Sequence, residues 1–258
     1  MPRAILFDLG DTLIDFEPMD TRAVFRTGAA NTYAFLLGRG HSLPPFDNYC
    51  NRQFRAVRWA YFMAKLRRRE FNGVQLLQSF CASIGVNLDH PSLMELAWLW
   101  YEPLTNHSGV EQDLSATLAE LSRAGFKLGL VSNTFVAGSI HDRHLELHGL
   151  LESLPVRVYS SDVGFRKPDR RIFQMALDQL DVSAAETLFV GDLVKTDIVG
   201  ARRLGMKTAL KQPWGSSRSH RMADFVIRKL SDLPEILGRF APPTTPEMKP
   251  AGFAMVSA

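Results

Sequence analysis

Only two cysteines, Cys50 and Cys81, occur in the 258 residues of the chain. Two cysteines alone do not build a disulfide framework, and they lack the paired spacing of a structural zinc site. We therefore expect both thiols to be buried as small apolar side chains, in a protein of the reducing cytosol.

Long apolar segments are also missing. No stretch approaches the roughly 20 apolar residues that a membrane-spanning helix requires. A short apolar run near the start, in MPRAILFDLGDTL, is interrupted by Asp8, whereas a secretory signal has a longer apolar stretch after a basic start. The sequence therefore predicts a soluble, cytoplasmic protein with no membrane partner.

Neither sign of charge is in marked excess, because 30 Lys and Arg residues stand against 27 Asp and Glu residues. A formal net charge of +3 creates no field that would favour nucleic acid. A hydrophobic content of 46% is typical of an ordinary folded protein. The composition leaves room for a small anionic substrate in a locally positive pocket, and nothing in it indicates an oligomeric state.

Short apolar runs that end in polar or glycine-rich turns recur along the chain. They are AILF, KLGLV, VRVY and TLFV, followed by KTAL and DFVI. From residue 113 onward they alternate with the helical patterns DLSATLAELSRAG, RRIFQMALDQL and TDIVGARRLGM. This alternation is typical of α/β proteins, so the sequence predicts a doubly wound, Rossmann-like parallel sheet with helices on both faces.

Residues 18–109 show a different pattern, because apolar residues recur at helical spacing and strand signals are absent. We expect an all-helical domain there, inserted after the first strand, so that the α/β domain consists of residues 1–17 and 110–240. The last segment, residues 241–258, contains four prolines and is predicted to be a disordered tail. His141, His144 and His148 also recur at helical spacing and are predicted to form a surface stripe rather than a metal site.

Polar residues with chemical potential follow the ends of the predicted strands. In a parallel sheet, ligands bind beyond the carboxyl ends of the strands. The residues found there are Asp8, Ser132, Gly191 and Asp192, with Lys167 and Asp197 from neighbouring loops. Three carboxylates at one sheet edge repel one another, and a hard divalent cation relieves that repulsion. The sequence therefore predicts a Mg²⁺ site.

A phosphoryl group bound beside such an ion carries negative charge that needs further neutralisation. Lys167, Ser132 and Asn133 supply an ammonium, a hydroxyl and an amide suited to that task. The carboxylate of Asp8, held in line with the phosphorus, is the candidate nucleophile.

Four motifs together resemble the haloacid dehalogenase (HAD) superfamily, in its phosphatase branch with a helical cap. They are FDLGDTL, LVSNT, VGFRKPD and VGDLVKTDIVGARRLGM, and they occur in the family's order. The resemblance implies that Asp8 is the nucleophile and a metal ligand, and that the carbonyl of Gly10 is a further ligand. It also implies that Ser132 binds a phosphoryl oxygen, Lys167 neutralises Asp8 and phosphate, and Asp192 and Asp197 hold Mg²⁺. The implied substrate is a small phosphorylated metabolite.

The sequence departs from the family's pattern at one position. Phosphatases of the family usually carry a second aspartate two residues after the nucleophile, where it acts as general acid and base. This chain has Gly10 there and an aspartate one residue later, at Asp11. Loss of a general acid typically costs about 10²–10⁴-fold in rate.

Three explanations of this departure remain open. Asp11 reaches the leaving group through a distorted turn, the leaving group needs no acid, or the protein binds phosphate compounds without efficient turnover. The family's dehalogenases and phosphonate hydrolases also lack the second aspartate, although the dehalogenases lack the pair formed by Gly191 and Asp192. A phosphonate hydrolase needs a lysine from the cap, and Lys65, beside an arginine run, is predicted to be solvated.

Overall fold

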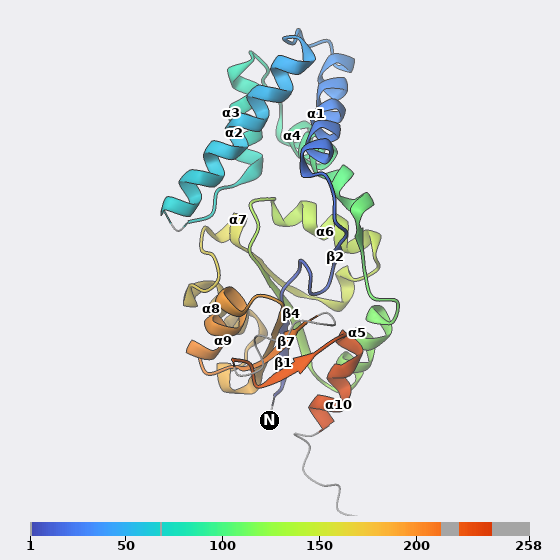
Figure 1. The fold of residues 1–258 in the computed structure, drawn as a ribbon, viewed down its shortest axis with the longest axis vertical. Coiled ribbons are helices and arrows are strands. Elements are labelled where there is room, and N and C mark those ends of the chain that lie inside the picture. The colour runs from blue at the N-terminus through green and yellow to red at the C-terminus, as the bar shows by residue number, and fades with distance from the viewer. Residues whose placement is uncertain (1, 68, 213–221, 239–258) are drawn as a thin grey trace, which may run out of the picture.

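A six-stranded parallel sheet forms the centre of the computed structural model, which describes residues 2–67, 69–212 and 222–238 (Figure 1). The strand order is β5-β4-β1-β6-β7-β8. The strands are β1 (Ala4–Phe7), β4 (Lys127–Ser132), β5 (Val156–Tyr159), β6 (Thr187–Gly191), β7 (Lys207–Lys211) and β8 (Phe225–Ile227). Each of them coincides with one of the predicted apolar runs, so the predicted fold class is confirmed.

Helices cover both faces of the sheet. Alternate residues of the central strand β1 point to opposite faces, so both faces carry apolar side chains that are buried against helices. Ile5 and Phe7 pack against α5 (Leu114–Arg123), α6 (Gly138–Leu147) and α10 (Leu233–Gly238). Ala4 and Leu6 pack against α8 (Arg170–Leu180) and α9 (Val199–Arg203). Figure 1 shows α8 and α9 on one side of the sheet and α5 and α10 on the other. Short elements complete this α/β layer: α7 (Ser160–Val163) and the single turns η2 (Leu151–Ser153), η3 (Ala184–Glu186), η4 (Val194–Ile198) and η5 (Leu230–Asp232).

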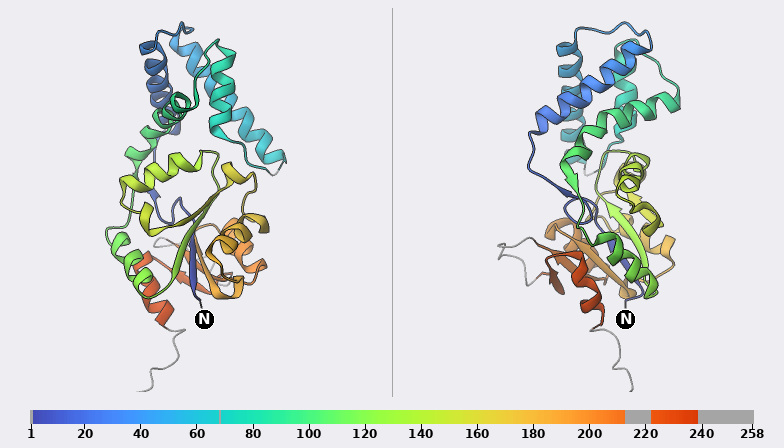
Figure 2. Two further views of the ribbon diagram at one scale, coloured as in Figure 1. Left: turned by 180° about the vertical axis from the view of Figure 1, so that it is seen from behind. Right: turned by 90° about the vertical axis from the view of Figure 1, so that its right-hand side faces the viewer.

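Between β1 and β4 the described chain forms a helical insert, which we define as residues 21–107. It contains α1 (Thr21–Gly38), α2 (Phe46–Arg67), α3 (Gly73–Ser83), α4 (His90–Tyr101) and η1 (Glu102–His107). Asp20, Asn72 and Asp89 cap the amino ends of α1, α3 and α4, each accepting backbone N–H bonds through its side chain. Figures 1 and 2 show the insert gathered at one end of the molecule, beyond the carboxyl ends of the strands.

Besides the contact of Tyr101 in α4 with His144 in α6, the insert is joined to the α/β layer at two further places. Its entry and exit segments form a small antiparallel pair, β2 (Asp15–Phe16) with β3 (Ser108–Gly109). The second place is the loop before α3, where the Gly73 N–H donates to the Phe135 carbonyl at 2.7 Å and Phe71 stacks on the Phe135 ring. Phe135 lies three residues beyond the end of β4, so this contact brings the insert close to the edge where ligands bind.

Several predictions on single residues have a clear outcome. Cys50 and Cys81 are free and buried, as expected. The predicted surface stripe of histidines is wrong, because His141 and His144 are buried, with 6% and 0% of their surface exposed. Their hydroxyl partners, Tyr101 in the insert and Thr134 in the loop after β4, lie outside the helix, so periodicity gave no signal of burial. The predicted tail, residues 241–258, lies outside the described residues.

Among the helices of the described residues, none is both long and apolar enough to cross a membrane.

Candidate active site

Three carboxylates meet at the carboxyl edge of the central strands. Asp8 follows β1, and Asp192 follows β6, which pairs with β1 in parallel register. Asp197 comes from the turn η4, and ligand oxygens of the three residues all lie within 4.8 Å of one another. Ser132 ends β4 on the other side of β1 and is buried. The structure thus brings these four sequence-predicted residues to one edge of the sheet.

Lys167 is the buried cation of this cluster, with 3% of its surface exposed. Its Nζ lies 2.5 Å from Asp8 Oδ1 and 2.9 Å from Asp197 Oδ1. Burial opposes the charge of Lys167, but the two carboxylates outweigh it and raise the pKa of the ammonium above its ordinary value. Lys167 is therefore positively charged and bonded directly to the candidate nucleophile.

Asn133 holds Lys167 in place through the main chain. Its Oδ1 accepts the Lys167 N–H at 2.7 Å, and its Nδ2 donates to the Lys167 carbonyl at 3.0 Å. Both polar atoms of the side chain are therefore occupied. The predicted contact between Asn133 and phosphate would have to come from its backbone N–H, since its side chain positions the lysine.

The charge of the cluster remains unbalanced, because one ammonium faces three carboxylates. Asp192 Oδ1 is buried without a hydrogen-bond partner. Burial first, and then the charges of Asp8, Asp197 and Asp11, raise the pKa of Asp192 to about 7. Burial also raises the pKa of Asp8, against the opposing effect of Lys167. Three converging carboxylates with an unpartnered oxygen suit a hard divalent cation with oxygen ligands.

Gly191 is required by the close approach of Asp197. A Cβ atom at residue 191 would lie 2.7 Å from Asp197 Cβ and 2.7 Å from Asp197 Oδ2. Asp197 Oδ2 also accepts the Leu193 N–H at 3.0 Å, which fixes the carboxylate against the turn. A side chain at residue 191 would therefore clash with Asp197, which explains the glycine before Asp192 in a way that the motif alone does not reveal.

The turn after Asp8 shows how Gly10 and Asp11 are placed. Asp11 is exposed and has a left-handed backbone with φ 54°, a region that aspartate tolerates better than most residues. Its Oδ1 accepts the Phe16 N–H at 3.3 Å, and its charge contributes to the raised pKa of Asp192. A Cβ atom at Gly10 would make only an ordinary contact, 3.6 Å from Phe16 Cε2. The backbone therefore does not demand glycine at residue 10.

Lys211, which the sequence analysis did not identify, holds the turn after Asp8 in place. Its Nζ donates to the Thr12 carbonyl at 2.8 Å and lies 2.9 Å from Asp15 Oδ1 and 3.0 Å from Glu111 Oε1. Lys211 ends β7, so it obeys the same rule of strand ends that identified Asp8 and Asp192. Inspection of the later strands by that rule would have found it.

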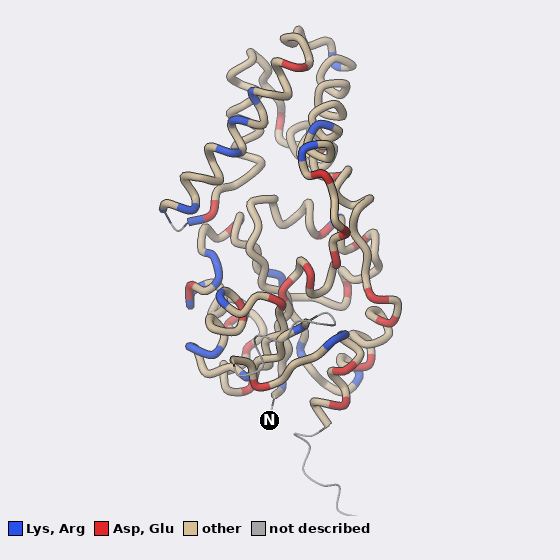
Figure 3. The backbone as a smooth tube through the Cα atoms, viewed as in Figure 1, with Lys and Arg blue, Asp and Glu red and all other residues tan. Residues whose placement is uncertain are grey.

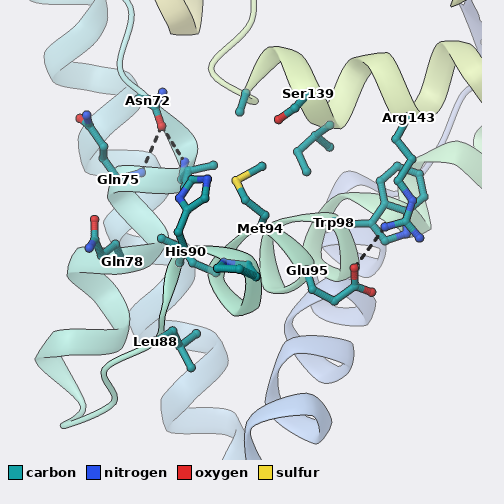
Figure 4. A pocket seen from close by; sticks show the side chains of 15 residues that line it. Asn72, Gln75, Gln78, Leu88, His90, Met94, Glu95, Trp98, Ser139 and Arg143 are labelled. Atoms are coloured by element: carbon teal, nitrogen blue, oxygen red, sulfur yellow. Dashed lines mark hydrogen bonds and ion pairs between the residues drawn. The ribbon is translucent and has the colours of Figure 1, made fainter.

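A cavity of about 550 Å³ opens beside the cluster, between α2 and the α/β layer. Tyr61 and Lys65 line it from the insert, while Asn133, Lys167 and Arg203 line it from the other side. A larger cavity of about 720 Å³ lies between α3, α4 and α6 (Figure 4). Figure 4 shows it lined by Gln75, His90 and the Arg143–Glu95 ion pair. Lys167 does not line the larger cavity but does line the cavity of about 550 Å³, so the latter is the one that leads to the chemistry.

Among known proteins, one relative matches most of the chain and another matches about half of it. The ribulose-1,5-bisphosphate 5-phosphatase of Halopiger xanaduensis is 24% identical over 92% of this chain and 100% of its own length. The pyrophosphatase PpaX of Bacillus mycoides is 37% identical, but the match spans 48% of this chain and 57% of that protein. The chain thus covers little more than half the length of this second relative.

Two solved structures share the whole architecture. A HAD phosphatase from Thermococcus onnurineus matches with a TM-score of 0.58 and 26% identity, over 92% of this chain and 98% of that one. A 2-haloacid dehalogenase from Pseudomonas syringae pv. Tomato matches with a TM-score of 0.62 and 26% identity, over 93% and 100%. The model of the haloacid dehalogenase-like hydrolases matches residues 2–205. With the carboxylate cluster and Lys167 at the sheet edge, this match shows that the chain belongs to the haloacid dehalogenase-like hydrolase family.

Proposed function

We propose that the protein is a magnesium-dependent phosphatase that hydrolyses a small phosphate monoester through an aspartyl-phosphate on Asp8. The observation that carries the proposal is the buried contact of Lys167 with Asp8 and Asp197, beside the unpartnered oxygen of Asp192. A nucleophilic carboxylate, a fixed cation and a further acidic pair suit a substrate that is itself an anion. The phosphatases among the relatives support the same reaction class.

The chemistry proceeds in two displacements at phosphorus. In the first, a carboxylate oxygen of Asp8 bonds to phosphorus while the bond to the leaving oxygen breaks. In the second, a water oxygen attacks the aspartyl-phosphate, so that inorganic phosphate leaves and the Asp8 carboxylate is restored. Lys167 neutralises the phosphoryl oxygens throughout, and the Ser132 hydroxyl at the end of β4 donates to one of them.

Asp8, Asp192, Asp197 and the Gly10 carbonyl would hold the Mg²⁺ ion. Bound there, Mg²⁺ neutralises the carboxylates and polarises the phosphoryl group. Asp197 is held in place for this role, because it is bonded to the Leu193 N–H and cannot turn away without losing that bond.

Asp11 is the proposed general acid and base. It gives a proton to the leaving oxygen in the first displacement and takes one from water in the second. The support is its exposure at the turn next to Asp8 and its electrostatic effect on Asp192. Its hydrogen bond to Phe16 is long, at 3.3 Å, so little is lost when the carboxylate turns toward a substrate.

The helical insert is proposed to act as a cap domain over this site. α2 lines the cavity beside Lys167, and residues 70–73 contact the loop after β4. A cap in this place excludes water during the first displacement and supplies side chains that select the substrate. The substrate is proposed to be a small phosphorylated metabolite, because a cavity of about 550 Å³ accommodates little more.

Hydrolysis of an aryl phosphate tests the proposal, since an aryl leaving group needs little protonation. We expect turnover by the wild type with Mg²⁺, none after chelation, and none in Asp8→Asn. Asp11→Asn should retain aryl phosphate turnover but lose about 10²-fold or more on alkyl phosphates. A wild type that is folded, loaded with Mg²⁺ and inert on both substrates contradicts the proposal.

Cleavage of a carbon–halogen bond is the second candidate, favoured by one observation. Gly10 offers no acid, and the 2-haloacid dehalogenase of P. syringae has the same fold at 26% identity. Release of halide from a 2-haloacid, independent of Mg²⁺, would favour this candidate. Asp8→Asn would abolish both activities, so the dependence on the cation separates the two.

A further inference from the structure

The walls of the cavity beside Lys167 carry more positive charge than the reaction centre uses. Lys65 lines it from α2 of the insert, and Arg166 and Arg203 line it from the α/β layer. Figure 3 shows basic positions at the carboxyl end of α2 and on the segments of the α/β layer that face it. The cavity therefore has cations on both sides of the junction between the two parts.

Some of these cations already have an acidic partner. Arg166 Nε lies 3.3 Å from Glu70 Oε2, and the Glu70 side chain is 2% exposed. The one carboxylate among the residues that line the cavity, Asp169, binds Arg171 at 2.6 Å. Lys167 is matched by Asp8 and Asp197. The acidic groups near the cavity are thus engaged elsewhere.

Lys65 and Arg203 stand apart from the other cations. Both side chains are exposed, and neither makes an ion pair with any residue in the described ranges. They line one cavity from different parts of the molecule, so closing the insert over the cavity would bring two like charges closer together. A bound anion between them would reverse that effect.

We propose that the substrate carries a second anionic group besides the phosphate that is cleaved, and that Lys65 and Arg203 bind this second group. The inference rests on the proposed phosphatase function, because Lys167 and the cation site take the first phosphate. The second group is a phosphate or a carboxylate at the far end of the same small molecule. Tyr61, which lines the cavity one turn before Lys65, contacts the carbon skeleton between the two anions.

This arrangement joins substrate selection to closure. A molecule with two anionic ends contacts Lys167 at one end and both Lys65 and Arg203 at the other, so it holds the insert against the α/β layer. A molecule with one phosphate leaves the repulsion between Lys65 and Arg203 in place. The difference in free energy between the two ligands is therefore the quantity to measure.

Equilibrium binding in the Asp8→Asn variant with Mg²⁺ measures this difference without turnover. The ligands are two matched pairs, fructose 1,6-bisphosphate with fructose 6-phosphate, and 3-phosphoglycerate with glycerol 3-phosphate. We expect the doubly anionic member of at least one pair to bind about tenfold tighter or more, which corresponds to ~1.4 kcal/mol. The pair with the larger ratio shows whether the second group is phosphate or carboxylate.

Substitutions at the two cations locate the effect. Lys65→Gln and Arg203→Gln should each reduce the ratio within the preferred pair by about tenfold, while Arg55→Gln and Arg202→Gln serve as matched controls on α2 and α9. Arg55 and Arg202 do not line the cavity, and they donate to the carbonyls of Asn51 and Met222. The controls should leave the ratio unchanged.

The outcomes separate this inference from the function on which it rests. Equal affinity within both pairs, or a ratio that Lys65→Gln and Arg203→Gln leave intact, overturns the second-anion site even if the wild type hydrolyses aryl phosphate. Failure of the wild type on aryl phosphate overturns the phosphatase, whereas the binding ratios still decide whether this cavity holds a second anion.

Discussion

At the scale of single residues, the turn after Asp8 is where this chain departs from its family. Asp11 takes a left-handed conformation, while Gly10 has ordinary backbone angles and free space where a Cβ would lie. Glycine is usually retained where a side chain would clash or where φ is positive, and neither reason applies at residue 10. The fold therefore does not require glycine at residue 10, and the missing acid there is not explained by the backbone.

Gly10→Asp should raise the rate of alkyl phosphate hydrolysis by about 10–10²-fold, because it places a second carboxylate at the usual position of the general acid. Aryl phosphate hydrolysis should change little. Steady-state kinetics on both substrates measure the effect, and Gly10→Asn controls for the added volume. If the alkyl rate falls in both variants, the added side chain blocks the site, and a carboxylate at residue 10 does not add to the proposed acid catalysis by Asp11.

At the scale of secondary-structure elements, the sheet edge could be predicted from the sequence to a large extent. The strand ends could be recognised as apolar runs that lead to Asp8, Ser132 and Asp192. Parallel strands place the residues at their carboxyl ends on one edge of the sheet, so these three side chains could be expected to lie together. The pairing of β2 with β3 was not visible, since two-residue strands have no periodicity. The ion pair between Lys211 and Glu111 was equally hidden, because the two residues are 100 positions apart and only the tertiary fold brings them together.

Lys211→Met should lower the free energy of unfolding by about 2 kcal/mol, because it leaves the largely buried Glu111 without its cation, whereas the half-exposed Asp15 is solvated by water. It should also reduce aryl phosphate turnover, since the Thr12 carbonyl loses the bond that fixes the turn after Asp8. Urea denaturation and kinetics measure the two effects. Lys211→Arg keeps the charge and should recover part of the stability. An unchanged midpoint in Lys211→Met would mean that water replaces the ammonium without cost.

At the scale of the whole molecule, a buried chain of hydroxyls and imidazoles crosses the junction between the insert and the α/β layer. Ser108 Oγ donates to the Thr105 carbonyl, so it accepts from His144 Nε2 at 2.9 Å. His144 Nδ1 is then the acceptor for the Tyr101 hydroxyl at 2.8 Å. His141 bonds Thr134 at 2.8 Å through its Nε2. The bond donated by Tyr101 requires a neutral His144 ring, and burial lowers the pKa of His141 to about 3 and of His144 to about 4.

Stability should therefore fall as the pH falls below the ordinary histidine pKa of about 6.5. The unfolded chain takes up protons between pH 6.5 and the lowered folded pKa values, so the contribution of these histidines is complete above pH 6.5 and is lost toward pH 3–4. Between pH 7.5 and 5 the loss from His141 is about 2 kcal/mol. The groups that face the two rings are hydroxyls and the His148 ring, and the nearby Asp142 carboxylate is bound by Tyr159 and Arg157.

Thermal denaturation across this pH range measures the effect. His144→Gln should flatten the dependence of the melting temperature on pH, because glutamine keeps the hydrogen-bonding groups without titrating. His90→Gln, at an exposed histidine, should leave the dependence as in the wild type. If the melting temperature of His144→Gln depends on pH as steeply as that of the wild type, other groups cause the acid sensitivity.

The separate attachments of the helical insert, which include the contact of α4 with α6, limit the size of what reaches Asp8. The β2–β3 pair holds the insert on one side, and the contacts of residues 70–73 hold it on another (Figure 1). Rotation about any one attachment strains the others, so we expect the insert to tilt only through small angles unless one set of contacts breaks. Small molecules can enter and leave through such an opening. We expect a phosphorylated side chain on a folded protein to be excluded, because its backbone would have to pass between α2 and the strand ends.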